Sequence, residues 1–159
     1  MNRNFKLRIL VAALVVTFVL SIAPSSQAAS GKCSLSKLAG TYGLTTTGSI
    51  PGIGPVAAVG LITIDASGNI SGSQTRSLNG GIADETFTGT ATVNSDCTGT
   101  GTVSVFESGI LVRTSTLKLV FDDDGRSAPA IFKSLVLPNG ASLPTVTIEA
   151  QKVFSGKSE

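Results

Sequence analysis

Hydrophobic and polar residues alternate in short runs along most of the chain, from about residue 41 to residue 154. Within 85–93, threonines alternate with residues suited to a core, namely Phe87, Gly89, Ala91 and Val93. The same alternation is found within 98–107 and 144–154. A period of two with one hydroxyl-rich face is typical of an antiparallel sheet that covers a core. The pattern therefore predicts β-strands.

Seven turn signals divide this region into eight strands. The turns are PGIGP (51–55), DASGN (65–69), NGG (79–81), NSDC (94–97), ESG (107–109), DDDG (122–125) and PNG (138–140). The strands expected between them are 41–49, 56–65, 70–78, 85–93, 98–107, 110–121, 128–137 and 144–154. Short strands that are separated by tight turns, with no helical period between them, indicate a sandwich or a barrel.

Each connection is short enough for an antiparallel hairpin, which favours an up-and-down meander over a Greek key. Closure of the meander removes the exposed edges that Thr/Val-rich strands would otherwise present. The sequence thus predicts an all-β fold, an eight-stranded antiparallel up-and-down barrel. Residues 34–40 are expected to form a short helical turn that closes the base of this barrel.

The first 28 residues have the order of a secretory signal peptide. Basic residues come first, a largely apolar run follows at 9–22, and small residues precede a predicted cleavage site after Ala28. The run is shorter than the roughly 20 residues of a membrane span, which favours cleavage over an uncleaved anchor. We therefore expect residues 1–28 to be removed, and residues 29–159 to form one β-barrel domain in the periplasm or the medium.

Removal of the signal peptide changes the charge of the chain. It takes away three of the 12 basic residues and none of the 10 acidic ones, so nine basic side chains face ten acidic ones and the net charge becomes −1. No basic patch remains to neutralise phosphates, so nucleic acid is not an expected partner. The residues before Cys33 do not form a lipidation signal, so no stable membrane anchor is expected after cleavage.

Histidine and tryptophan are absent from the chain. This excludes Ser-His-Asp and Cys-His catalysis and histidine-bound zinc. The acidic run at 122–124 is a candidate calcium site, but it lacks the spaced oxygen ligands and distal Glu of a helix-loop-helix site. A solvated hairpin turn is the preferred interpretation, and neither a metal nor a cofactor is expected.

The chain contains two cysteines, Cys33 and Cys97. An even number of cysteines in an exported protein predicts a disulfide. Alternate turns of a meander lie at the same end, so the segment before the first strand and the 94–97 turn should meet at the base. A reactive thiol would need a basic neighbour, whereas Cys97 follows Asp96.

Polar residues fall on inward-facing positions near the other end of the predicted barrel, the mouth. They are Gln74, Arg76, Glu85, Glu107 and Arg113. Arg113 shares its predicted face with Leu111, Leu117 and Leu119. Two interpretations are open. The charges either form ion pairs at strand ends or a plug in a filled barrel, or they orient a ligand at the opening of an apolar cavity.

Three segments carry a resemblance to known proteins: LAGTYG (38–43), ITIDASGNISG (62–72) and NSDCTGTGTV (94–103). They resemble a group of uncharacterised secreted bacterial proteins, which implies secretion and this fold but no activity. Gly40-Thr41-Tyr42 is similar to the Gly-x-Trp opening of lipocalin-type barrels, with tyrosine in place of tryptophan. Allene-oxide-cyclase-like barrels are another shape that the chain resembles.

The preferred function is that of a secreted barrel that binds a small, largely apolar ligand, with Arg76 and Arg113 orienting a polar or acidic group. One alternative is a structural or adhesive surface module that contacts other proteins. The other is a cyclase- or isomerase-like enzyme in which Glu85 and Glu107 serve as acid and base. Arginine neighbours favour ionised glutamates, which argues against catalysis. No oligomeric state is predicted.

Overall fold

The structure is a computed structural model that describes residues 32–142 and 145–153. The predicted signal peptide, residues 1–28, lies outside the described residues, so its cleavage remains a prediction. Within the described ranges the chain is organised as one short helix followed by nine strands. These are α2 (Leu35–Leu38), β1 (Gly40–Ile50), β2 (Gly54–Ile64), β3 (Asn69–Leu78), β4 (Gly81–Val93), β5 (Thr98–Glu107), β6 (Ile110–Val120), β7 (Ala130–Leu137), β8 (Gly140–Ser142) and β9 (Thr145–Lys152).

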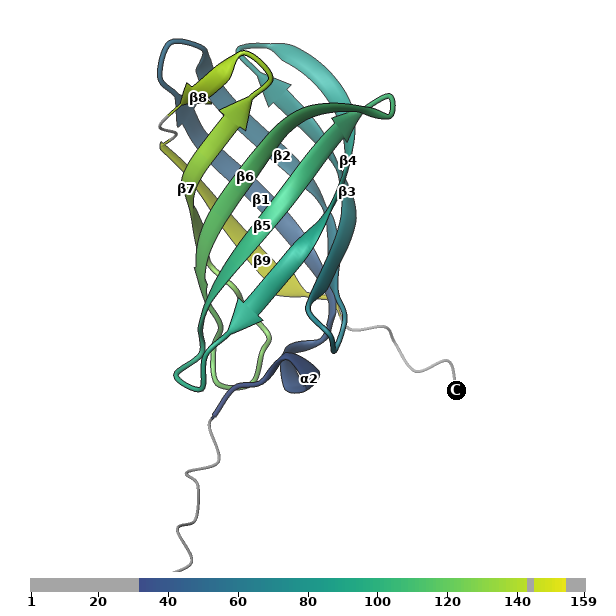
Figure 1. Cartoon of the computed structure of the whole chain (residues 1–159), viewed down its shortest axis with the longest axis vertical. Helices are drawn as coiled ribbons and strands as arrows, with labels where there is room; N and C mark the ends of the chain where they lie inside the picture. The colour runs from purple at the N-terminus through teal and green to yellow at the C-terminus, as the bar shows by residue number, and fades with distance from the viewer. Residues whose placement is uncertain (1–31, 143–144, 154–159) are drawn as a thin grey trace, which may run out of the picture. The chain divides into compact units, whose positions relative to one another are not determined.

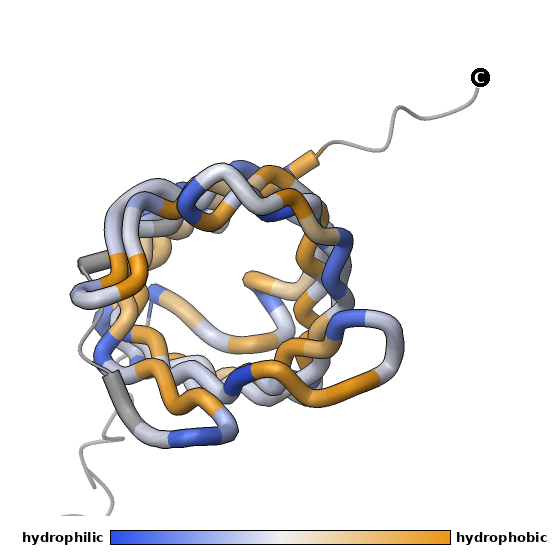
Figure 2. The backbone as a smooth tube through the Cα atoms, turned by 90° about the horizontal axis from the view of Figure 1, so that it is seen from above, coloured by the Kyte–Doolittle hydropathy of each residue, from blue (hydrophilic) through white to orange (hydrophobic). Residues whose placement is uncertain are grey.

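The strands form a closed antiparallel barrel. Their order in the sheet is β6-β5-β4-β3-β2-β1-β9-β7-β8, and an additional β6–β7 pairing joins the two sides. Both β8 and β9 pair with β7, so the two together occupy the eighth position. Viewed from above, the backbone forms a closed ring (Figure 2). The predicted eight-stranded barrel is thereby confirmed.

Strand β4 begins at Gly81, four residues earlier than the sequence predicted. It pairs with β3 up to Leu78↔Gly81, so Asn79 and Gly80 alone connect the two strands. Both residues have positive φ, 48° and 87°, which is the geometry of a type I′ turn. This turn matches the right-handed twist of the strands, and the hairpin therefore extends to its tip.

Two apolar clusters occupy the interior. The larger one extends from the base through most of the barrel and includes Tyr42, Phe87 and Phe121. The smaller one lies at the mouth and consists of Ile50, Val56, Leu135 and Val146. On the inner face of β3 the Phe87 ring lies over Gly72, where an added Cβ would be 2.5 Å from the ring.

The base of the barrel is closed by α2 and by the segment before it (Figure 1). Ser34 caps the helix by accepting a hydrogen bond from the Lys37 N–H, and Leu38 is fully buried. The Cys33–Cys97 disulfide, with a Cα–Cα distance of 5.0 Å, joins this segment to the β4–β5 turn. Both the helical turn and the disulfide confirm the sequence predictions. No helix in the described part of the chain is long and apolar enough to cross a membrane.

Candidate functional site

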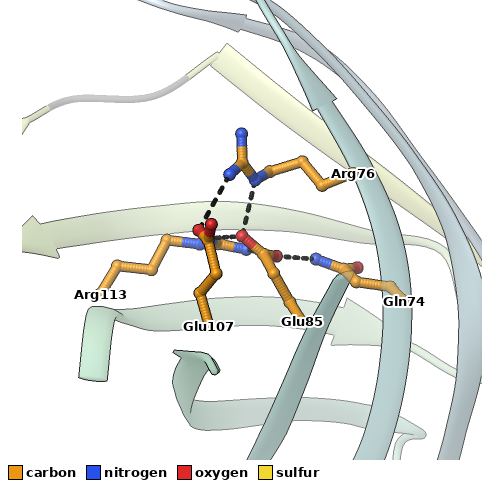
Figure 3. A network of polar contacts seen from close by, with 5 residues as sticks. All are labelled: Gln74, Arg76, Glu85, Glu107 and Arg113. Carbon is orange, nitrogen blue, oxygen red and sulfur yellow. Dashed lines mark hydrogen bonds and ion pairs between the residues drawn. The ribbon is translucent and has the colours of Figure 1, made fainter. Parts of the chain in front are cut away.

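All five polar residues predicted to face inward at the mouth come together in one network (Figure 3). Strand β3 carries Gln74 and Arg76, β4 carries Glu85, β5 carries Glu107 and β6 carries Arg113. Glu85 is the cross-strand partner of Gln74 on one side and of Glu107 on the other. Four consecutive strands of the meander thus bring the network together.

Glu85 is the centre of this network. Arg113 donates from Nη1 to Oε1 at 2.6 Å and from Nη2 to Oε2 at 2.7 Å. Arg76 donates from Nε to Oε1 at 2.6 Å, and Gln74 donates from Nε2 to Oε2 at 2.8 Å. Each carboxylate oxygen therefore accepts two hydrogen bonds. A bidentate Arg–carboxylate pair is among the strongest polar contacts in proteins.

The Glu85 carboxylate is removed from water, since its side chain is 0% exposed. Burial alone would raise its pKa. The hydrogen bonds and charge of Arg113, with those from Gln74 and Arg76, outweigh burial and lower the pKa from 4.5 to about 2. Glu85 is therefore ionised at neutral pH, and it is a poor candidate for a general acid.

A β-bulge interrupts the alternation of β6 next to Arg113. The β5–β6 register runs Val105↔Arg113 and then Phe106↔Leu111, which leaves Val112 without a partner. Two residues of a bulged strand oppose one on its neighbour, so both Val112 and Arg113 line the interior. The prediction that Leu111 shares the inward face of Arg113 is wrong, because the bulge shifts the alternation and leaves Leu111 46% exposed.

Arg76 has a second, weaker ion pair. Its Nη2 lies 3.5 Å from Oε2 of Glu107. The Arg76 side chain is 14% exposed, whereas the Glu107 side chain is 44% exposed. The network therefore has a buried part, made of Gln74, Arg76, Glu85 and Arg113, and an accessible carboxylate at its edge.

A cavity of about 200 Å³ lies inside the barrel, beside this network. Three members of the network line it: Gln74, Arg76 and Arg113. The sequence had already placed three of the other lining residues, Phe87, Leu117 and Leu119, on inward faces. For most of the rest an inward position in the alternating pattern was the available signal, but not for Val112 at the bulge or Ile53 in a turn. The other lining residues are Tyr42, Leu44, Thr46, Ile50, Ile53, Val56, Ala58, Ile62, Ile64, Leu78, Phe87, Val103, Val105, Val112, Leu117, Leu119, Phe121, Ala128, Ala130, Phe132, Leu137, Val146 and Ala150.

The mouth half of the barrel has two unlike walls. Strands β3 to β6 contribute the polar network, whereas β1, β2, β7 and β9 contribute the apolar cluster of Ile50, Val56, Leu135 and Val146. A molecule in this half would contact hydrogen-bond donors on one side and hydrocarbon on the other. The site is therefore suited to an amphipathic small molecule.

The base of the cavity is formed around Tyr42. Its ring lines the cavity, and its hydroxyl lies within hydrogen-bond distance of the Leu38 carbonyl and, at 3.0 Å, of the Gly125 carbonyl. Burial, with a smaller contribution from the charge of Asp122, raises the pKa of Tyr42 to about 12. Its hydroxyl is therefore neutral and connects the α2 segment to the β6–β7 turn.

Ser115 is a buried polar residue that sequence reasoning missed. It lies on β6 between Arg113 and Leu117, and its side chain is fully buried. Its Oγ has no hydrogen-bond partner within the described ranges. Ser115 is two residues after Arg113, so the alternating pattern places both on the inner face of the strand. That position was the signal that could have identified it.

The acidic turn at 122–125 is engaged in contacts within the protein. Asp122 accepts a hydrogen bond from the Arg126 N–H, Asp124 pairs with Arg126 at 2.8 Å, and Asp123 pairs with Lys32 at 3.4 Å. Among the described residues, no group of three or more His, Cys, Asp or Glu side chains could hold a metal ion.

No family model matches the chain, and no curated protein matches it. Solved structures with the same fold are found. A redesigned β-barrel, mFAP1, bound to DFHBI, is 14% identical with a TM-score of 0.50, over 75% of this chain and 98% of that one. The barrel EF1p2_mFAP2b bound to DFHBI is 12% identical with a TM-score of 0.55, over 78% of this chain and 100% of that one. At these identities the likeness shows the fold.

Proposed function

We propose that this protein binds a small, largely apolar ligand in the cavity of its barrel, with the ligand's polar or acidic group beside Arg76. The observation that carries the proposal is the combination of an apolar cavity of about 200 Å³ with arginine and amide side chains on one wall. Ligand sites are typically concave and apolar with a few placed polar groups. The interior of an eight-stranded barrel is either filled by side chains or holds one small ligand, and the cavity favours the second case.

Two further observations support this proposal. The two barrels of similar fold, mFAP1 and EF1p2_mFAP2b, are each described as bound to DFHBI, so this architecture holds a ligand in those proteins. In addition, the disulfide indicates a non-reducing, extracytoplasmic environment. We propose that the protein is secreted and meets its ligand there.

A second candidate function is contact with other proteins through the mouth. It is favoured by Ile82 and Ile110, which are 69% and 70% exposed beside the β3–β4 and β5–β6 turns. In that case the cavity would have no role in partner recognition. Ligand binding in the cavity therefore distinguishes the two functions.

Native mass spectrometry of the protein, purified under gentle conditions and compared with its denatured mass, is the test of ligand binding. We expect a discrete adduct that is lost on denaturation. Substitution Ala58→Leu would fill the cavity, because Ala58 is buried and lines it. Ala57→Leu is the matched control, since Ala57 is exposed on the outer face of the same strand.

The expected result is an adduct on the wild type and on Ala57→Leu, and its loss from Ala58→Leu. Ala150→Val, at a second lining position, is expected to weaken the adduct if Ala58→Leu does not fold. An adduct retained on both cavity variants, or a bare wild type after exposure to lipid and metabolite extracts, would contradict the proposal and favour the protein-contact function.

A further inference from the structure

The two arginines of the network have different free donors. Arg113 uses both terminal nitrogens on Glu85. Arg76 uses only Nε on Glu85, while its Nη2 lies 3.5 Å from Glu107 and its Nη1 makes no hydrogen bond to a described residue. An arginine has five N–H donors, so Arg113 keeps three of them, but on Arg76 both terminal nitrogens make no hydrogen bond to a described residue. Of these two cationic groups that line the cavity, Arg76 therefore has more donors available to a ligand.

The buried part of the network carries an uncompensated charge. Arg76, Arg113 and Glu85 sum to +1, and Gln74 is neutral. Glu107 supplies the missing negative charge, but it is 44% exposed and its pair with Arg76 is long. An ion pair of this kind is weak, because water screens it and the free side chain gains rotamer entropy. A carboxylate from a ligand could therefore take its place at little cost.

The size of the cavity limits the rest of the ligand. A dry protein cavity of roughly 150 Å³ that is lined by Leu, Ile and Phe binds benzene, whereas drug-sized ligands occupy about 300–1,000 Å³. The cavity here, at about 200 Å³, is close to the first case and has the same kind of lining. It fits a single ring or a short branched chain, with a small polar group attached.

We infer that the ligand is a small monocarboxylate of about one aromatic ring in size, and that its carboxylate replaces that of Glu107 beside Arg76. This inference rests on the proposed function and specifies its ligand. Glu107 occupies the place of the ligand's charged group, and it competes with any anion for the free donors of Arg76. Arg113 is a positioning residue, since it holds Glu85 and, through Glu85, the Nε of Arg76.

The test compares phenylacetate with its neutral analogue phenylacetamide by isothermal titration calorimetry. We expect phenylacetate to bind the wild type at least about tenfold more tightly, since charge-assisted hydrogen bonds exceed neutral ones. Glu107→Gln removes the competing carboxylate and should raise phenylacetate affinity about 3–10-fold, with no change for phenylacetamide. Asp84→Asn is the matched control, because Asp84 is an exposed acid next to Glu85 and faces outward.

Arg76→Gln should abolish the preference for phenylacetate over phenylacetamide, and Arg76→Lys should retain part of it if Arg76→Gln does not fold. Equal binding of the two probes, or an unchanged phenylacetate affinity in Glu107→Gln, would overturn the inference while the proposed function stands. Failure of both probes to bind also overturns it, and the native mass measurement then decides on the proposed function separately.

Discussion

Arg113 binds Glu85 through two parallel hydrogen bonds, of 2.6 and 2.7 Å, across the interior of the barrel. The two residues come from β6 and β4, strands that are not neighbours in the sheet. The pair therefore spans β5 and fixes the relative positions of three strands at the mouth. It also limits the donors that Arg113 can offer a ligand, because each of its terminal nitrogens already donates one hydrogen bond to Glu85.

Substitution Glu85→Gln should destabilise the protein strongly. It removes the fully buried negative charge that pairs with Arg76 and Arg113, and breaking a buried ion pair from one side costs about 3–5 kcal/mol. The midpoint of urea unfolding, with an unchanged slope, measures this. Glu107→Gln is the control, with a cost of at most about 1 kcal/mol, since its pair is half exposed. Equal costs for the two variants would contradict the buried role of Glu85.

The stability of the protein at acidic pH should depend on the same carboxylate, that of Glu85. The pKa of Glu85 is about 2 in the folded protein and near 4.5 when unfolded, so the folded state favours its ionised form. The resulting stability, roughly 3 kcal/mol by linkage, is fully present above pH 4.5 and is lost as the pH falls towards 2. Urea midpoints measured across this window should fall more steeply for the wild type than for Glu85→Gln. Parallel curves would show that the pKa is not lowered.

The single tyrosine offers a direct optical measurement. Burial and the charge of Asp122 raise the pKa of Tyr42 from its ordinary value of 10.0 to about 12. Folding therefore favours the neutral phenol, and this contribution to stability is lost as the pH rises through 10 towards 12. Ultraviolet absorbance of the phenolate should show ionisation near pH 12 in the native protein and near pH 10 in denaturant. The same midpoint in both would contradict the buried position of Tyr42.

Replacing both cysteines, by Cys33→Ala with Cys97→Ala, should lower stability without changing the barrel. The disulfide closes a loop of 64 residues, which in the chain-entropy model corresponds to about 4 kcal/mol. Urea unfolding of the double variant measures the loss. Reduction of the wild type under native conditions should give a comparable decrease. A loss below about 1 kcal/mol would mean that α2 holds its position through Leu38 and Tyr42 alone.

Much of the fold was predictable from the sequence because its causes are local. Alternation set which side chains face inward, and the seven turn sequences set where strands end. Two cysteines at the same end of a meander identified the disulfide. The five residues of the polar network were also recognised, because the alternating pattern places them on inward-facing positions. Prediction failed where the alternation is interrupted, as at the bulge that leaves Leu111 exposed and places Val112 inside.

The sequence by itself thus determined the strands, the order of the meander, the cysteine pair and the set of inward polar residues. Only the tertiary structure decided that a cavity lies beside the network, that Arg113 binds Glu85 through both terminal nitrogens, and that Arg76 binds it through Nε alone. The physical reason is that these properties depend on distances across the closed barrel. Register, bulges and side-chain conformations set those distances, and they are fixed when β6 and β7 close the sheet.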